Sequence, residues 1–120
     1  WKGFLDFRNE PGTWDGYEEK TRQNFLRRTP AQLANFNANA NNRTTVSEMD
    51  LIEQPTLVIR GVNTSLYDIR MSEIVANKIP DARFLIIEDA GHMSPLTHPV
   101  RITQEILDHI ENVKVKAQGL

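Results

Sequence analysis

The sequence contains no cysteine among its 120 residues, which excludes disulfide bonds, cysteine-ligated zinc and thiol nucleophiles. Positive and negative charges nearly balance, since 14 basic and 16 acidic residues give a net charge of -2. A binder of nucleic acid or of an anionic membrane surface needs clustered Lys and Arg, and the chain has no such excess. Its apolar runs also fall short of the roughly 18 residues that span a bilayer. We therefore expect neither a nucleic-acid partner nor a membrane partner.

Signals of targeting and of metal or cofactor binding are also missing. The chain starts at Trp1, and no basic segment followed by an apolar one comes after it, as a secretory signal peptide would require. We expect a cytoplasmic protein that is either processed or part of a longer one. The three histidines lack the spacing of a metal site, and no glycine-rich phosphate loop occurs. We predict no metal and no cofactor.

The composition changes near residue 47, where an Asn-rich and aromatic region gives way to an aliphatic one. Residues 55–61 form a β-branched apolar run bounded by Pro and Gly, which predicts a buried strand. After this strand come apolar residues at helical spacing over 69–79, a second apolar strand at 84–88, and a helix that begins at Pro99. This order predicts a βαβα unit with a parallel sheet, preceded by helices. Two strands are too few for a stable sheet, so further strands must come from elsewhere.

His92 is the first candidate for chemistry. It follows Gly91 at the carboxyl end of the second strand, where open α/β sheets place ligands and catalytic groups. A turn histidine with only local hydrogen bonds explains the position equally well. Asp68, in the loop after the first strand, is the one carboxylate there that could orient the imidazole. It could equally cap the helix over 69–79.

The ordered set of segments from Ile52 to Glu111 resembles the C-terminal portion of the α/β-hydrolase superfamily. The shared features are a Pro-Thr-Leu strand ending in Gly, a helix ending in Ile-Pro-x-Ala, a strand leading into Gly-His, and a final helix opened by Pro. Residues 4–15, reading FLDFRNEPGTWD, are similar to the cap segment of an esterase-like branch. The resemblance covers more than half of the chain.

This resemblance implies a division into a helical cap or lid at 1–50 and the C-terminal part of the core at 51–120. The two strands would be the seventh and eighth of the family's sheet, and His92 would be its general base. Leu66 and Met93, beside the two strand ends, would line the substrate pocket. The implied partners are a small apolar ester or amide and the N-terminal part of the same hydrolase.

Two departures from the family pattern concern the acid and the nucleophile. The family's acid usually lies three residues after the glycine of the seventh strand, and Thr64 occupies that place. Either Asp68 substitutes for it or the acid comes from a further strand, which we favour. No Gly-x-Ser-x-Gly nucleophile elbow occurs in the 120 residues.

The sequence therefore predicts the C-terminal fragment of a serine-type α/β-hydrolase of the esterase or lipase kind, inactive by itself. The alternative is an α/β interaction or dimerisation module without catalysis, which would form a homo-oligomer. A hydrolase-fold lyase is a further alternative.

Overall fold

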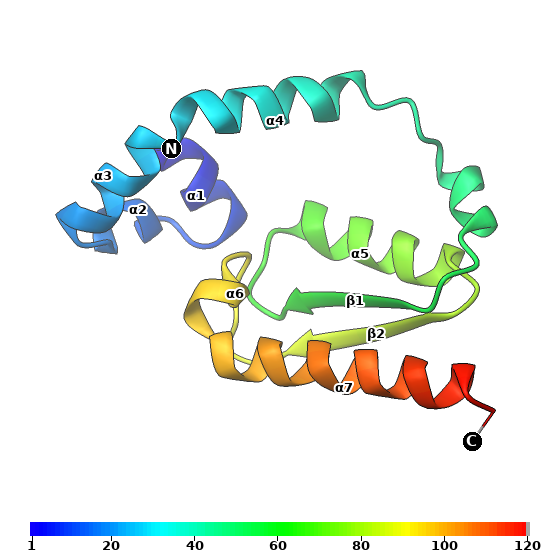
Figure 1. The fold of residues 1–120 in the computed structure, drawn as a ribbon. Coiled ribbons are helices and arrows are strands. Elements are labelled where there is room, and N and C mark those ends of the chain that lie inside the picture. Colours follow the sequence, from blue (N-terminus) through cyan, green and yellow to red (C-terminus); the bar gives the residue numbers. More distant parts are fainter. Residues whose placement is uncertain (120) are drawn as a thin grey trace. The chain divides into compact units, whose positions relative to one another are not determined.

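The computed structural model describes residues 1–119 and divides the chain into two compact units, Trp1–Thr45 and the part from Val46 onward. The first unit is helical, and the second combines helices with a parallel sheet (Figure 1). The predicted α/β class, with helices preceding a βαβα segment, is confirmed. The unit boundary lies five residues before the predicted division at 50/51, and the segment between them is a 3-10 helix, η1, at Val46–Leu51.

The helical unit is built around aromatic side chains. Its helices are α1 (Lys2–Arg8), α2 (Thr13–Gly16), α3 (Glu19–Arg27) and α4 (Thr29–Asn41). The ring of Phe25 lies 4.9 Å from that of Trp1, 6.1 Å from Trp14 and 5.6 Å from Tyr17. Leu5 of α1 is fully buried. Burial of Tyr17 raises the pKa of its phenol, as expected for a ring packed in an apolar cluster.

The second unit places a two-stranded sheet between two helices. Strand β1 (Thr56–Gly61) leads through α5 (Leu66–Lys78) to β2 (Ala82–Ile87), and α6 (Ser94–Thr97) and α7 (Pro99–Ala117) follow. The strands run parallel in a register that pairs Thr56 with Ala82 and Gly61 with Ile87. Figure 1 shows α5 and α7 on opposite sides of the strands. Two parallel strands joined by a helix are the arrangement expected of a βαβ segment.

The core of this unit lies between the sheet and α7. Ile87, Ala90 and Ile102 are buried together, and Ile59 and Leu85 pack against them. Odd-numbered residues of β1 and β2 therefore face α7, while even-numbered residues such as Arg60 and Phe84 face α5, because side chains alternate along a strand. The predicted strand at 84–88 begins two residues earlier and ends one earlier than expected, since the backbone of Ala82 and Arg83 already pairs with β1.

Candidate active site

The site is formed by the two loops that follow β1 and β2 at the carboxyl edge of the sheet. Backbone hydrogen bonds join these loops, from the Val62 N–H to the Ile87 carbonyl at 3.0 Å and from the Asn63 N–H to the Ala90 carbonyl at 2.9 Å. Gly61 permits this approach, because a Cβ on it would lie 2.0 Å from the Ala90 oxygen. The loops that lead to Asp68 and to His92 are therefore held against one another by main-chain contacts.

Asp68 lies in the first turn of α5, three residues after the residue that caps it. The N-cap is Ser65, whose Oγ accepts a hydrogen bond from the Asp68 N–H at 3.2 Å. Ser65 Oγ also lies 2.7 Å from Asp68 Oδ2, and Thr64 Oγ1 donates to the same oxygen at 3.3 Å. Of the two roles left open for Asp68, N-cap of this helix is thus filled by Ser65. The hydroxyl groups hold the carboxylate in one orientation.

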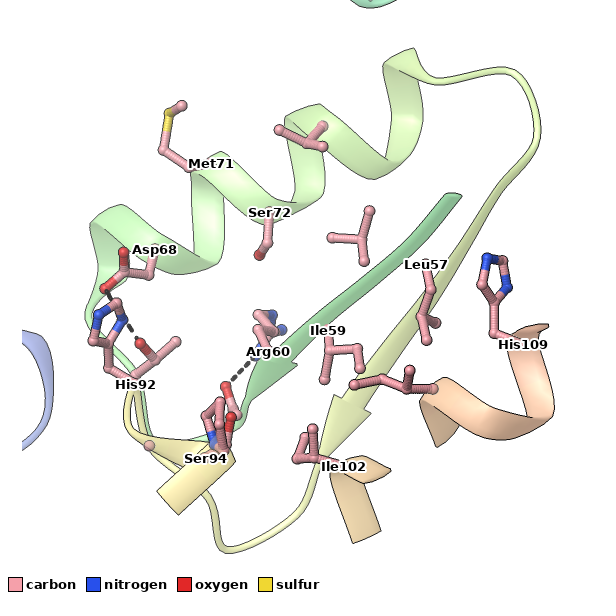
Figure 2. A pocket seen from close by; sticks show the side chains of 17 residues that line it. Leu57, Ile59, Arg60, Asp68, Met71, Ser72, His92, Ser94, Ile102 and His109 are labelled. Carbon is pink, nitrogen blue, oxygen red and sulfur yellow. Dashed lines mark hydrogen bonds and ion pairs between the residues drawn. The ribbon is translucent and has the colours of Figure 1, made fainter. Parts of the chain in front are cut away.

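His92 faces this carboxylate. Its Nδ1 lies 3.6 Å from Asp68 Oδ2, and the side chains are 34% and 16% exposed. Figure 2 shows the imidazole beside the carboxylate, with His92 coming from the loop after β2 and Asp68 from α5. The distance suits an ion pair but is longer than a hydrogen bond. Catalytic contacts of this kind are often long before substrate binds.

Both side chains border an open pocket of about 710 Å³ that continues along β1 (Figure 2). One wall comes from α5, with Met71 and Ser72, and the other from α7, with Ile102 and Ile106. Arg60 of β1 lies on the floor of this pocket. Apolar side chains therefore form most of the lining, and polar groups lie at both ends, His92 with Asp68 at one and His109 at the other.

The predicted substrate-lining residues are not among those that line this pocket. Leu66 is exposed at the start of α5, and Met93 is half-buried next to His92. Their role in binding substrate stays a prediction.

Sequence reasoning missed two polar residues and misjudged a third. Ser65 caps α5 and orients Asp68, a role signalled by the Ser-x-x-Asp spacing. Arg60 was not proposed, because it lies within an otherwise apolar run that predicts a buried strand. The sequence pattern of the last helix places His109 on its polar side, where a solvated side chain is expected, yet the Nε2 of His109 lies 3.2 Å from the Pro55 carbonyl. Only the packing of α7 on the start of β1 produces that contact.

Over residues 1–119, no three His, Asp or Glu side chains converge to hold a metal ion. None of the described helices combines the length and the apolar character required to cross a bilayer.

The chain is similar to two curated hydrolases. It is 35% identical over 51 residues to a pimeloyl-[acyl-carrier protein] methyl ester esterase of Aromatoleum aromaticum, covering 42% of this chain and 20% of the relative. It is 31% identical over 87 residues to a protein of Pseudomonas savastanoi named as the carbamate hydrolase RutD, covering 72% of this chain and 30% of that one. These matches support a relationship to the α/β-hydrolase superfamily. The chain spans less than a third of either relative's length.

No protein-family model matches the chain, and no solved structure matches it either. The relationship to hydrolases therefore depends on the two partial sequence matches. The parallel βαβα arrangement is consistent with that relationship.

Proposed function

We propose that this chain supplies the general-base histidine and its acid to a serine-type hydrolase. The observation that carries the proposal is the pairing of His92 Nδ1 with Asp68 Oδ2, 3.6 Å apart, at the carboxyl edge of a parallel sheet. Base and orienting acid are two of the three parts of a catalytic triad. The hydrolase names of the two relatives agree with this chemistry.

The orientation of the imidazole assigns the two ring nitrogens their roles. With Nδ1 facing the carboxylate, Nε2 would take the proton from the serine hydroxyl as its oxygen attacks the substrate carbonyl carbon. The imidazolium then returns this proton to the leaving group, and neutral His92 next takes a proton from the water that hydrolyses the acyl-enzyme. The negative charge of Asp68 stabilises the imidazolium in both steps.

Asp68 suits this role because the hydroxyl groups of Ser65 and Thr64 hold its carboxylate on the side that faces His92. The helix that carries it is fixed at its first turn by the Ser65 cap. Asp68 thus takes the place that Thr64 cannot fill, since a hydroxyl has no charge to offer an imidazolium.

The nucleophile and the oxyanion hole are, in this proposal, contributed by the N-terminal part of the same hydrolase. No Gly-x-Ser-x-Gly occurs in the 120 residues, and more than two thirds of each relative's length lies outside the matched region. Residues 1–50 would form the helical cap or lid. A fluorophosphonate probe, which labels activated serines, should not label the 120-residue chain by itself, and labelling would contradict the proposal.

A small apolar ester or amide is the substrate class that we propose. One relative is named for the methyl ester of a pimeloyl-[acyl-carrier protein] and the other for a carbamate, so both names refer to a carbonyl group of the ester or amide kind. Leu66 and Met93 place apolar side chains next to Asp68 and His92 in the sequence, where they would contact such a substrate.

The decisive experiment measures hydrolysis of p-nitrophenyl acetate and butyrate by the polypeptide that includes the nucleophile. His92→Gln should lower kcat by about 10³-fold or more, and Asp68→Asn by about 10²- to 10⁴-fold. His98→Gln is the matched control, because His98 contacts the Thr97 hydroxyl and should leave kcat unchanged. Full activity of the His92 variant would refute the proposal. Loss with His92→Gln but not with Asp68→Asn would assign the acid to another strand.

A further inference from the structure

The hydroxyl group of Ser65 makes two contacts with the same residue. Its Oγ accepts a hydrogen bond from the Asp68 N–H at 3.2 Å, which caps α5, and it donates one to Asp68 Oδ2 at 2.7 Å. A serine hydroxyl has one proton to donate and can accept at the same time, so the two contacts are compatible. The single hydroxyl proton of Ser65 is therefore directed to the carboxylate that faces His92.

The position of Asp68 in α5 offers its carboxylate a competing contact. Asp68 is the third residue of the helix, and in a capping box an acidic side chain at this place turns back to accept from the backbone N–H of the capping residue. A carboxylate that rotates toward this N–H moves its oxygens relative to His92. The Ser65 hydroxyl opposes such a rotation, because it holds Oδ2 where that oxygen lies 3.6 Å from His92 Nδ1 (Figure 2).

Thr64 adds a second and weaker contact. Its Oγ1 donates to the same carboxylate oxygen at 3.3 Å, whereas the contact from Ser65 is 2.7 Å long. Ser65, Thr64 and Asp68 are all partly buried, where a hydrogen bond is electrostatically stronger than in water. The orientation of the Asp68 carboxylate therefore depends mainly on Ser65.

We propose that Ser65 is a positioning residue that fixes the tautomer of His92 through Asp68. A neutral imidazole carries its proton on one nitrogen, and the hydrogen bonds of the ring decide which one. With Asp68 Oδ2 facing Nδ1, the proton lies on Nδ1, and Nε2 keeps the lone pair that a general base needs. When the carboxylate turns away, the Nε2–H form gains population. The inference rests on the proposed function, because it concerns the nitrogen that would accept the serine proton.

The test measures the tautomer of His92 in the 120-residue chain by long-range proton–nitrogen NMR of labelled imidazoles, at a pH where the ring is neutral. His92→Gln assigns the signal by its loss. We expect the Nδ1–H form to predominate in the unchanged chain. Ser65→Ala should lower the ratio of the Nδ1–H form to the Nε2–H form about five-fold, the effect of one lost hydrogen bond. Ser65→Thr keeps the hydroxyl and should restore the ratio.

Ser65→Gly separates positioning of Asp68 from capping of α5. Glycine is a better N-cap than alanine, so Ser65→Gly should destabilise the helix less than Ser65→Ala does. Positioning predicts the same loss of the Nδ1–H form in both variants, because neither has a hydroxyl group. Capping alone predicts that Ser65→Gly resembles the unchanged chain. Thr64→Val should lower the ratio less than either variant, since the Thr64 contact is longer.

Thr97→Ala is the matched control. The Thr97 Oγ1 lies 2.8 Å from His98 Nδ1, so loss of this hydroxyl should alter the signals of His98 and leave the ratio at His92 unchanged. Circular dichroism shows whether each variant is folded. If Ser65→Ala fails to fold, Ser65→Gly and Thr64→Val still test the proposal.

Three results would overturn the proposal. The first is a majority of the Nε2–H form at His92 in the unchanged chain. The second is an unchanged ratio in the folded variants that lack the Ser65 hydroxyl. The third is a ratio in Ser65→Gly equal to that of the unchanged chain while Ser65→Ala loses it, which would assign Ser65 to capping alone. Each result leaves His92 able to act with an acid from another strand, whereas full activity of His92→Gln refutes the proposed function whatever the tautomer.

Discussion

In the helical unit, Phe25 contacts three other aromatic rings, whereas in the second unit the closest packing is between backbone segments, with Gly61 against the Ala90 carbonyl. The first unit buries one large side chain completely, Leu5. The second unit joins its loops by main-chain hydrogen bonds and buries a small aliphatic cluster. The two loops of the second unit cannot separate without losing these main-chain contacts.

This difference matters because the candidate catalytic pair lies in the unit held by main-chain contacts. Both tryptophans, Trp1 and Trp14, lie in the helical unit, so tryptophan fluorescence reports its unfolding. Amide hydrogen exchange of β1 and β2 reports the second unit. The two probes together allow each substitution below to be assigned to one unit.

The largest effect is expected for Gly61→Ala. The added methyl group would lie 2.0 Å from the Ala90 oxygen, so the two loops must separate, at a cost of about 3 kcal/mol or more in unfolding free energy. Exchange of the β1 amides should accelerate while the tryptophan transition stays in place. Gly3→Ala is the control, because a methyl group there meets open space in α1. An unchanged β1 exchange rate in Gly61→Ala would contradict the role given to main-chain packing.

Phe25→Ala should produce the opposite pattern. Removal of the ring that contacts Trp1, Trp14 and Tyr17 should destabilise the helical unit by about 2 kcal/mol, less than for a fully buried Phe because this ring is only partly buried. The tryptophan transition should move to lower denaturant concentration. Phe25→Leu should restore about half of the loss. A simultaneous change in β1 exchange would show that the two units unfold together.

Glu105→Gln tests the one buried carboxylate of α7 that the structure describes. Its side chain is 10% exposed and lies 2.8 Å from Arg83 of β2 and 2.6 Å from Arg101. Because both arginines are partly exposed, we expect a loss of about 1–2 kcal/mol rather than the larger cost of a fully buried pair. Glu111→Gln, which breaks an exposed pair with Lys114, should change the unfolding free energy by less than about 0.5 kcal/mol. Equal effects of the two variants would refute a stabilising role for Glu105.

The smallest effect concerns the pH dependence of the helical unit. The Trp14 amide donates to Asp6 Oδ1 at 2.9 Å and lowers the pKa of this carboxyl below its usual value of 3.8. A depressed carboxyl pKa contributes stability that is present above the unfolded value and is lost as the pH falls through the folded value. The tryptophan transition should therefore weaken below about pH 4. Asp6→Asn should show less of this acid sensitivity, and an identical pH profile would exclude the contribution.

Much of the second unit could be predicted from the sequence because its signals are local. The apolar run bounded by Pro55 and Gly61 gave a strand that differs by one residue from β1, and Pro99 does begin α7. The start of α5 was expected at residue 69 but lies at Leu66, because the Ser65 cap was not recognised. A helix cap of this kind can be recognised from the sequence, because Ser65 and Asp68 have the three-residue spacing typical of a helix start.

The candidate site could be predicted only in part, because its contacts join distant segments. His92 and Asp68 could each be proposed as site residues because each follows a strand. From the local pattern, however, a purely structural role, as a turn residue or a helix cap, explained each position equally well. The structure places His92 Nδ1 3.6 Å from Asp68 Oδ2. Local sequence patterns cannot predict this contact, because the two residues belong to different segments. Arg60 was not proposed at all, since a strand pattern shows burial but not which donors lack an acceptor.

The sequence by itself therefore determined the order of elements, the parallel pairing and the place of the histidine at a strand end. These follow from periodicity, from Pro and Gly at element ends, and from the rule that a βαβ crossover makes strands parallel. Only the tertiary structure decided that Asp68 faces His92. That arrangement depends on the close approach of two loops more than twenty residues apart, which Gly61 allows because it has no Cβ to meet the Ala90 carbonyl.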